Sequence, residues 1–174
     1  MREWIPVSTS PKGRLALAAV REFGARPFDD VTVGELAAAA EVTTGALYHH
    51  FGSKLGLYTF VRDDVERRLL DRMEGAVAAA GDEQDRSAAV RTALLVGFDF
   101  AVREGFLHIL GTPPPGTERD ALADMLRAST APASPVLGVV LAAAWRAALA
   151  AVAEGSRPEP ARAALRALDL AISS

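Results

Sequence analysis

The 174-residue chain contains no cysteine. Disulfide bonds and zinc sites built on thiolates are therefore excluded, and a reducing compartment is compatible with the composition. Aromatic residues make up only 6% of the sequence, and the N-terminal segment MREWIPVSTSPKGR lacks the long apolar run of a signal peptide. We therefore expect a cytoplasmic protein that is stabilised by packing alone.

The sequence also lacks the residue patterns on which enzymes depend. Its three histidines are His49, His50 and His108, and the adjacent pair cannot place both rings on one face of a helix. No HExxH pattern, glycine-rich phosphate loop or nucleophile elbow occurs. We expect no catalytic residue, no metal, no cofactor and no enzymatic activity.

An excess of positive charge is missing as well. The chain has 19 basic and 22 acidic residues, and residues 1–60 hold six of each kind. Binding to nucleic acid through bulk charge is therefore excluded. Any contact with phosphate must depend on hydroxyl groups, helix N-termini and a few well-placed cations.

Residues 28–54, FDDVTVGELAAAAEVTTGALYHHFGSK, carry the most informative pattern in the chain. Thr32 is followed three positions later by Glu35, which is a capping box and predicts a helix over residues 33–41. Thr43 is typical of the N-cap of a second helix. Two short helices joined by a tight turn are predicted, as in a helix-turn-helix.

The faces of the second helix indicate what it does. Leu47 and Phe51 fall on one face, whereas Gly45, Tyr48 and His49 point away from it. An outward tyrosine and histidine beside a glycine suit a helix that enters the major groove of DNA. An ordinary helical hairpin within a bundle is the alternative that this spacing leaves open.

Residues 13–54 closely resemble the DNA-binding domain of the tetracycline-repressor (TetR) family of bacterial regulators. The matching residues are Phe23, Phe28, Thr32, Leu36, Ala37, Val42, Gly45, Leu47, Tyr48, Phe51, Ser53 and Lys54.

The resemblance implies a role for each matching position. Thr32 would cap its helix and touch phosphate, and Lys54 would bind phosphate at the next helix. The groove-facing set would be Thr43, Thr44, Gly45, Tyr48 and His49. The sequence departs from the family at Thr44, where many members carry lysine or arginine, and at Gly34, where a polar residue is common. Both departures should lower nonspecific affinity for DNA.

The remaining periodicity predicts an all-α chain. The resemblance implies an N-terminal three-helix domain, residues 1–54, and a helical ligand-binding and dimerisation domain, residues 55–174. The first helix is expected over residues 11–23 and to end at Gly24. Ser53 should cap a long helix that runs to about residue 80 and joins the two domains. Its charged residues are expected on a solvated face. They are Arg62, Asp63, Asp64, Glu66, Arg67, Arg68, Asp71, Arg72 and Glu74.

Residues 136–153 are almost wholly apolar and long enough to suggest a membrane span. Alanine contributes little to membrane insertion, and Arg146 in mid-helix would cost about 2.5–3.5 kcal/mol. We therefore expect a buried helix and no membrane. With a last helix that begins at Pro158, it should pair with a second copy of the chain. The residues expected at that dimer interface are Val140, Ala144, Ala148, Leu165, Leu168 and Ile172.

The resemblance implies a ligand-responsive regulator, most simply a repressor that binds a palindromic operator in double-stranded DNA as a homodimer and is released by a small-molecule effector. The effector is unknown. The residues expected to line its cavity are Phe98, Phe106, His108, Met125 and Trp145, each equally compatible with an ordinary core. A helical small-molecule-binding or scaffold protein that does not bind DNA is the alternative.

Overall fold

A computed structural model describes residues 9–80, 86–116, 119–132 and 135–169. Within these ranges the chain is all-α and contains no strand, as the sequence predicts. The elements are α1 (Pro11–Ala25), the 3-10 turn η1 (Phe28–Asp30), α2 (Val33–Ala39), α3 (Thr44–Phe51), α4 (Lys54–Ala79), α5 (Arg86–Glu104), α6 (Leu107–Gly111), α7 (Ala121–Thr130), α8 (Pro135–Ala153) and α9 (Pro158–Arg166).

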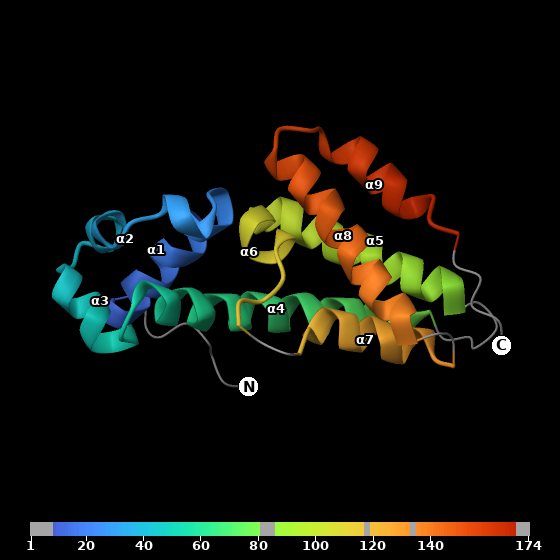
Figure 1. Cartoon of the computed structure of the whole chain (residues 1–174), viewed down its shortest axis with the longest axis horizontal. Coiled ribbons are helices and arrows are strands. Elements are labelled where there is room, and N and C mark those ends of the chain that lie inside the picture. Colours follow the sequence, from blue (N-terminus) through green and yellow to red (C-terminus); the bar gives the residue numbers. More distant parts are fainter. Residues whose placement is uncertain (1–8, 81–85, 117–118, 133–134, 170–174) are drawn as a thin grey trace.

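Helices α1, α2 and α3 gather at one end of the molecule, around the first turns of α4 (Figure 1). Leu15 of α1, Leu36 of α2, Leu47 of α3 and Leu57 of α4 are all fully buried there. One apolar residue from each helix thus contributes to a shared core. This core fixes the orientation of α3 relative to α1 and α4.

Helix α4 runs beneath both halves of the molecule (Figure 1). It begins where the hydroxyl of Ser53 accepts a hydrogen bond from the backbone N–H of Gly56, at 2.9 Å, as the sequence predicts. Beyond the N-terminal half it packs against α5, where Gly97 is buried. A β-carbon at Gly97 would lie 2.8 Å from the sulfur of Met73, so glycine allows α4 and α5 to approach closely.

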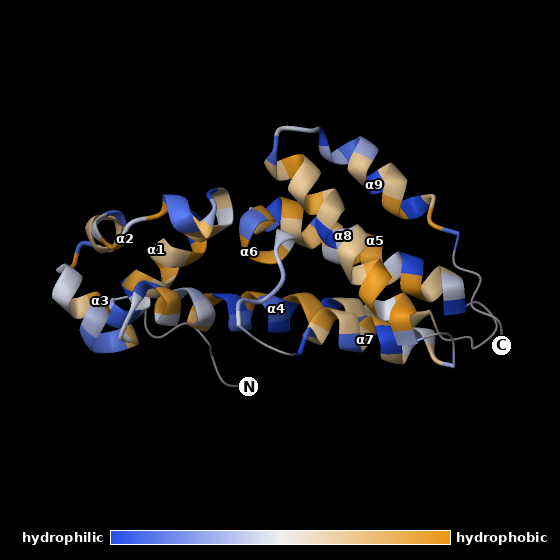
Figure 2. Cartoon of the chain, viewed as in Figure 1, coloured by the Kyte–Doolittle hydropathy of each residue, from blue (hydrophilic) through white to orange (hydrophobic). Residues whose placement is uncertain are grey.

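The C-terminal half is built around α8, which packs against α6, α7 and α9. Figure 2 shows α8 as predominantly hydrophobic, whereas α9 carries several hydrophilic residues. Trp145 is fully buried, and its indole N–H donates to the carbonyl oxygen of Leu94 at 3.0 Å. Gly138 lets α8 touch the backbone of α7, because a β-carbon there would lie 2.6 Å from the carbonyl oxygen of Ala123.

The two halves touch where α1 meets the turn between α5 and α6. The expectation that Gly24 ends the first helix is wrong: α1 continues to Ala25, and Gly24 is buried within it. A β-carbon on Gly24 would lie only 2.4 Å from the carbonyl oxygen of Gly105. Gly24 is therefore a contact point between helices, which sequence spacing alone does not reveal.

Two further expectations about helices need correction. Helix α2 ends at Ala39, and Glu41 turns the chain with a φ of 53° before α3 begins. The charged residues of α4 do not all face solvent, since Arg62 and Asp64 are 1% and 2% exposed. Neighbouring helices cover α4 on more than one side. Part of its polar face is therefore buried as well.

Helix α8 is long and apolar enough to cross a membrane by composition, with a mean hydropathy of 2.0. Within the chain 33% of its apolar window is buried, so the expectation of a buried helix holds for one face only. Leu141, Trp145, Arg146 and Leu149 are buried within the chain. The guanidinium of Arg146 is paired with Asp120, one of its nitrogens lying 2.8 Å from a carboxylate oxygen.

Candidate nucleic-acid interface

The entry to α2 is held by a capping box. The backbone N–H of Thr32 donates to the Glu35 carboxylate at 2.7 Å, and the backbone N–H of Glu35 donates to the Thr32 hydroxyl at 3.2 Å. The hydroxyl of Thr32 also donates to the same carboxylate. Because these hydrogen bonds stabilise the charged form, they lower the pKa of Glu35 to about 2. The predicted capping box is confirmed.

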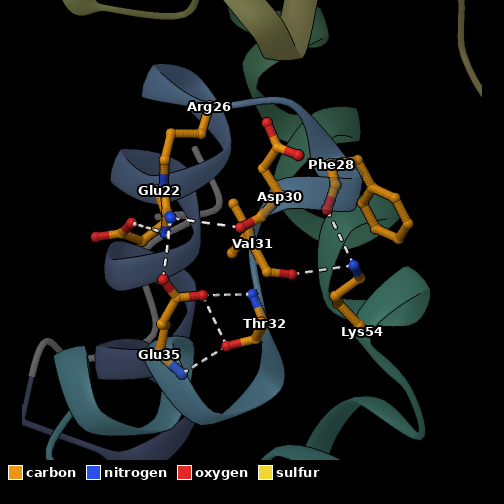
Figure 3. A network of polar contacts seen from close by, with 8 residues as sticks. All are labelled: Glu22, Arg26, Phe28, Asp30, Val31, Thr32, Glu35 and Lys54. Atoms are coloured by element: carbon orange, nitrogen blue, oxygen red, sulfur yellow. Dashed lines mark hydrogen bonds and ion pairs between the residues drawn. The ribbon is translucent and has the colours of Figure 1, made fainter.

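Arg26 ties the end of α1 to this cap (Figure 3). Its guanidinium lies 2.7 Å from a carboxylate oxygen of Glu22 and 3.0 Å from one of Glu35. It also donates to the carbonyl oxygen of Asp30 at 3.3 Å. One cation thus holds α1, η1 and α2 together. All three side chains in these ion pairs are partly exposed, so the pairs add little to the free energy of unfolding. Their main effect is to fix the positions of α1, η1 and α2 relative to one another.

Lys54 connects the first turn of α4 to η1. Its ammonium donates to the carbonyl oxygens of Phe28, at 2.9 Å, and Val31, at 3.0 Å (Figure 3). It also lies 4.0 Å from the centre of the Phe28 ring, where a cation–π attraction operates. An ammonium has three N–H donors, and two are used in these bonds. The expected contact between Lys54 and phosphate stays a prediction, and in this structure the side chain already has a positioning role.

Helix α3 exposes the face that lies opposite Leu47 to solvent. The hydroxyl of Thr43 accepts from the backbone N–H of Ala46 at 3.2 Å, which confirms the predicted N-cap. Leu47 is fully buried, whereas Tyr48 is 53% exposed. The other predicted groove-facing residues, Thr43, Thr44, Gly45 and His49, are exposed as well. Together they form one accessible surface on and just before α3.

A segment near the N-terminus matches a family of known proteins. Residues 16–59 fit the family model described as bacterial regulatory proteins, tetR family. Residues 16–59 thus form a domain of the TetR-family type. The matched range contains α2, α3, the turn between them and the start of α4, so the exposed face of α3 belongs to this domain.

Solved structures extend the likeness to the whole fold. A TetR-family transcriptional regulator from Pectobacterium atrosepticum superposes with a TM-score of 0.67 at 23% sequence identity, covering 90% of this chain and 88% of that one. The TetR-family repressor AlkX from a Dietzia strain, implicated in biodegradation of n-alkanes, aligns with a TM-score of 0.47 and 15% identity, over 92% and 94% of the two chains. The first match shows that the TetR-family domain here is joined to helices arranged as in a TetR-family regulator.

The five residues expected to line an effector cavity differ in their surroundings. Phe98, Phe106, Met125 and Trp145 are buried in the core. Phe100 and Phe106 meet edge to face at 5.5 Å, a core contact. Only His108 lines the cavity described below, which lies between the two halves of the molecule. The expectation that Phe98, Phe106, Met125 and Trp145 line an effector cavity stays a prediction.

The residues expected at a dimer interface differ in their exposure. Val140 is 54% exposed on α8, with the exposed Val136 and Val139 nearby, and Ala144, Ala148 and Leu168 are partly exposed. Leu165 is buried within its own chain, so it is not accessible to a second copy. Ala161 and Leu165 form the buried apolar side of α9, and beside them Arg162 pairs with Asp99 of α5 at 2.7 Å and 2.9 Å. Ile172 lies outside the described residues.

Sequence reasoning missed one buried polar centre. Arg62 donates to the hydroxyl of Tyr58 at 3.2 Å and to the carbonyl oxygens of Ile109 and Thr112, the latter at 2.7 Å. Arg62 therefore ties α4 to the end of α6. In the sequence it lies among other charges of α4, and no local signal distinguishes it from a solvated arginine.

Proposed function

We propose that this chain is a ligand-responsive transcriptional regulator, and most simply a repressor, that binds a palindromic operator as a homodimer and is released by a small-molecule effector. The observation that carries the proposal is the solvent-exposed set Thr43, Thr44, Gly45, Tyr48 and His49, backed by the buried Leu47 within a TetR-family domain. Hydroxyls and aromatic edges of this kind suit phosphates and base edges of the major groove.

We propose DNA contacts from three places in this domain. Thr32 and Lys54 would reach the phosphates on either side of α3, which itself lies in the groove. Few cations take part, so the affinity for DNA should decrease only gently with salt, with a slope near one per phosphate that is neutralised. Specificity then depends on the shape of α3 and on the spacing of two α3 helices.

Dimerisation is supported by the exposed valines of α8. Val136, Val139 and Val140 are each more than half exposed and lie within two turns of one helix. A two-fold pairing of this face would bring together two reading heads, which a palindromic operator with half-sites roughly 34–36 Å apart requires. Val140, Ala144, Ala148 and Leu168 remain our candidates for this interface.

We propose a cytoplasmic location, where a DNA-binding regulator meets its operator. The apolar helix α8 is accounted for by packing against α6, α7 and α9, together with a dimer partner on its valine face. The partly buried ion pair between Arg146 and Asp120 fits a helix of a water-soluble domain.

The test is selection of genomic fragments of the source organism by the purified protein, followed by titration of a selected palindrome. A TetR-like regulator should retain discrete palindromic fragments, and the binding stoichiometry should be two chains per palindrome. If no fragment is enriched over random DNA, the chain is instead a helical small-molecule-binding or scaffold protein that does not depend on DNA. The genes beside the enriched fragments would indicate the class of effector.

A further inference from the structure

A cavity of about 460 Å³ lies where the TetR-family domain meets the C-terminal half. Its walls come from the end of α1 and η1, from α4, from α6 and from the end of α8. The lining residues are Phe23, Pro27, Phe28, Asp29, Tyr58, Leu107, His108, Gly111, Thr112, Ala150, Ala153 and Glu154. This volume is within the range that holds a small organic molecule.

Three aromatic rings form one wall. Phe23 and Phe28 stack with their centres 5.7 Å apart, and Tyr58 meets them edge to face at 5.1 Å and 5.0 Å. Ala150 and Ala153 of α8 add small apolar side chains to the lining. This aromatic wall offers apolar surface for the body of an organic molecule. The face of Phe28 is already used by the ammonium of Lys54, 4.0 Å from the ring centre, so a positive group on the ligand must be held by carboxylates and not by the rings.

The charged lining residues are both acidic and come from opposite halves of the molecule. Asp29 belongs to η1 and Glu154 directly follows α8. Both are exposed, and within the described part of the chain neither makes an ion pair. Among the described residues no lysine or arginine lines the cavity, and the ammonium of Lys54 approaches it only through the ring of Phe28. Arg62 lies outside the lining, with its guanidinium engaged by Tyr58, Ile109 and Thr112.

We propose that this cavity binds an organic cation with an apolar body, such as an aromatic or alkyl amine or a quaternary ammonium compound. The apolar part would lie against the aromatic wall and the alanines of α8, and the positive group would lie near Asp29 and Glu154. Because its two carboxylates come from the two halves, the bound cation bridges them.

The position of the cavity also links the ligand to DNA, and this second step rests on the proposed function. Phe28, which borders the cavity, is held by Lys54 at both its ring and its carbonyl oxygen. The turn that contains Phe28 leads directly into α2. A ligand that contacts Phe28 therefore favours one placement of η1, and with it one placement of α2 and α3. Ligand and operator should change each other's affinity by the same factor.

The binding step can be tested without DNA, by calorimetry with benzyltrimethylammonium as the probe. The probe should bind with one site per chain. Similar-sized molecules without its charge, N-benzylacetamide and phenylacetate, should bind much more weakly. The double variant Asp29→Asn/Glu154→Gln should weaken binding of the cation by about tenfold, as expected for losing two partly screened attractions.

A matched control removes the same charge elsewhere. The variant Asp30→Asn/Glu159→Gln changes two exposed carboxylates, one beside Asp29 and one in α9, that do not line the cavity. It should leave the affinity for the cation unchanged. Equal binding of the three probes, or an equal loss in both double variants, would overturn the proposal. A far-ultraviolet circular dichroism spectrum shared by all variants excludes unfolding as the cause.

The linkage to DNA is measured separately, as the affinity for the cation with and without a saturating operator fragment. A change of about fivefold or more, within the usual range for coupled sites, supports the linkage. Unchanged affinity would overturn the linkage while leaving the cavity as a cation site. A chain that binds the cation but no DNA fragment would instead refute the proposed function, so the two failures are distinguishable.

Discussion

Ser10, Thr32, Thr43 and Ser53 begin four successive α-helices of the N-terminal half. Each hydroxyl accepts a hydrogen bond from the backbone N–H three residues further along the chain. Such a bond involves only neighbours in sequence, so helix starts can be predicted from residue identity. Lys54 differs, because its partners lie 26 and 23 residues away. At the scale of single residues, predictability therefore depends on the sequence distance of the partner.

Tyr48 offers the most direct test of the reading surface. The substitution Tyr48→Ala should reduce operator affinity by at least about tenfold, because an aromatic edge and a hydroxyl are lost from the groove-facing side. Its effect on the free energy of unfolding should stay within about 0.5 kcal/mol, since the side chain is exposed. Fluorescence anisotropy with a selected palindrome and a thermal melt measure the two quantities. Unchanged operator affinity would contradict the assignment of α3.

Lys54 should influence stability as well as DNA binding. In Lys54→Met the carbonyls of Phe28 and Val31 lose their donor, which should cost about 1–3 kcal/mol in the free energy of unfolding. If Lys54 also contacts phosphate, the variant should bind all DNA sequences more weakly and its salt slope should fall by about one unit. Urea melts and salt titrations separate the two roles. A slope equal to that of the wild type would leave Lys54 with only its positioning role.

The acidic cap of α2 should be sensitive to pH. The folded state lowers the pKa of Glu35 to about 2 from an ordinary value of 4.5. The stability from this carboxylate is therefore fully present above pH 4.5, and it is lost as the pH falls towards 2. The variant Glu35→Gln should be less stable than the wild type at pH 6, and the difference should shrink near pH 2. A difference that does not change with pH would contradict the role of the charged form.

At the scale of elements, close helix contacts explain where sequence patterns mislead. Glycine near the end of a helical segment usually marks the C-terminus of the helix, so the sequence predicts that the first helix ends at Gly24. Here Gly24 lies inside α1 because the carbonyl of Gly105 occupies the space where a side chain would be. Arg62 and Asp64 of α4 are similar cases, since helices distant in sequence cover them. In each case the deciding neighbour is not adjacent in the sequence.

The substitution Gly24→Ala should test the contact between the two halves. Its β-carbon would lie 2.4 Å from a backbone oxygen, so α1 must move away from the turn before α6. We expect a loss of about 1–3 kcal/mol in the free energy of unfolding, and altered operator affinity. The control is Gly75→Ala in α4, where nothing lies within 4 Å. That variant should gain about 0.5–1 kcal/mol from helix propensity. Equal effects of the two substitutions on stability would contradict the close contact.

At the scale of the whole molecule, the same helix can serve two surfaces. Helix α8 buries Trp145, Arg146 and Leu149 in its own chain and exposes Val136 and Val140. Helix α8 can be hydrophobic on both of these sides if its own chain covers one side and a dimer partner covers the other. A helix that is apolar on all sides is normally buried on all sides.

A charge on the valine face should disrupt the proposed dimer. The substitution Val140→Glu would place a carboxylate in an apolar interface, where an unpaired charge costs several kcal/mol to desolvate. Sedimentation should then show monomers at concentrations where the wild type is dimeric, with helix content unchanged. The control Ala128→Glu alters an exposed position on α7 and should leave the dimer intact. A full dimer in Val140→Glu would move the interface to another surface.

The sequence by itself determined the all-α class, the helix starts and the two faces of α3. These depend on hydrogen bonds and periodicity within a few residues, which residue identity encodes directly. Only the tertiary structure decided that Gly24 meets Gly105, that Arg62 is buried and that Leu165 faces inward. It also decided which side chains border the cavity between the two halves. Those features depend on which distant helices come together, and that arrangement follows from the packing of the whole chain.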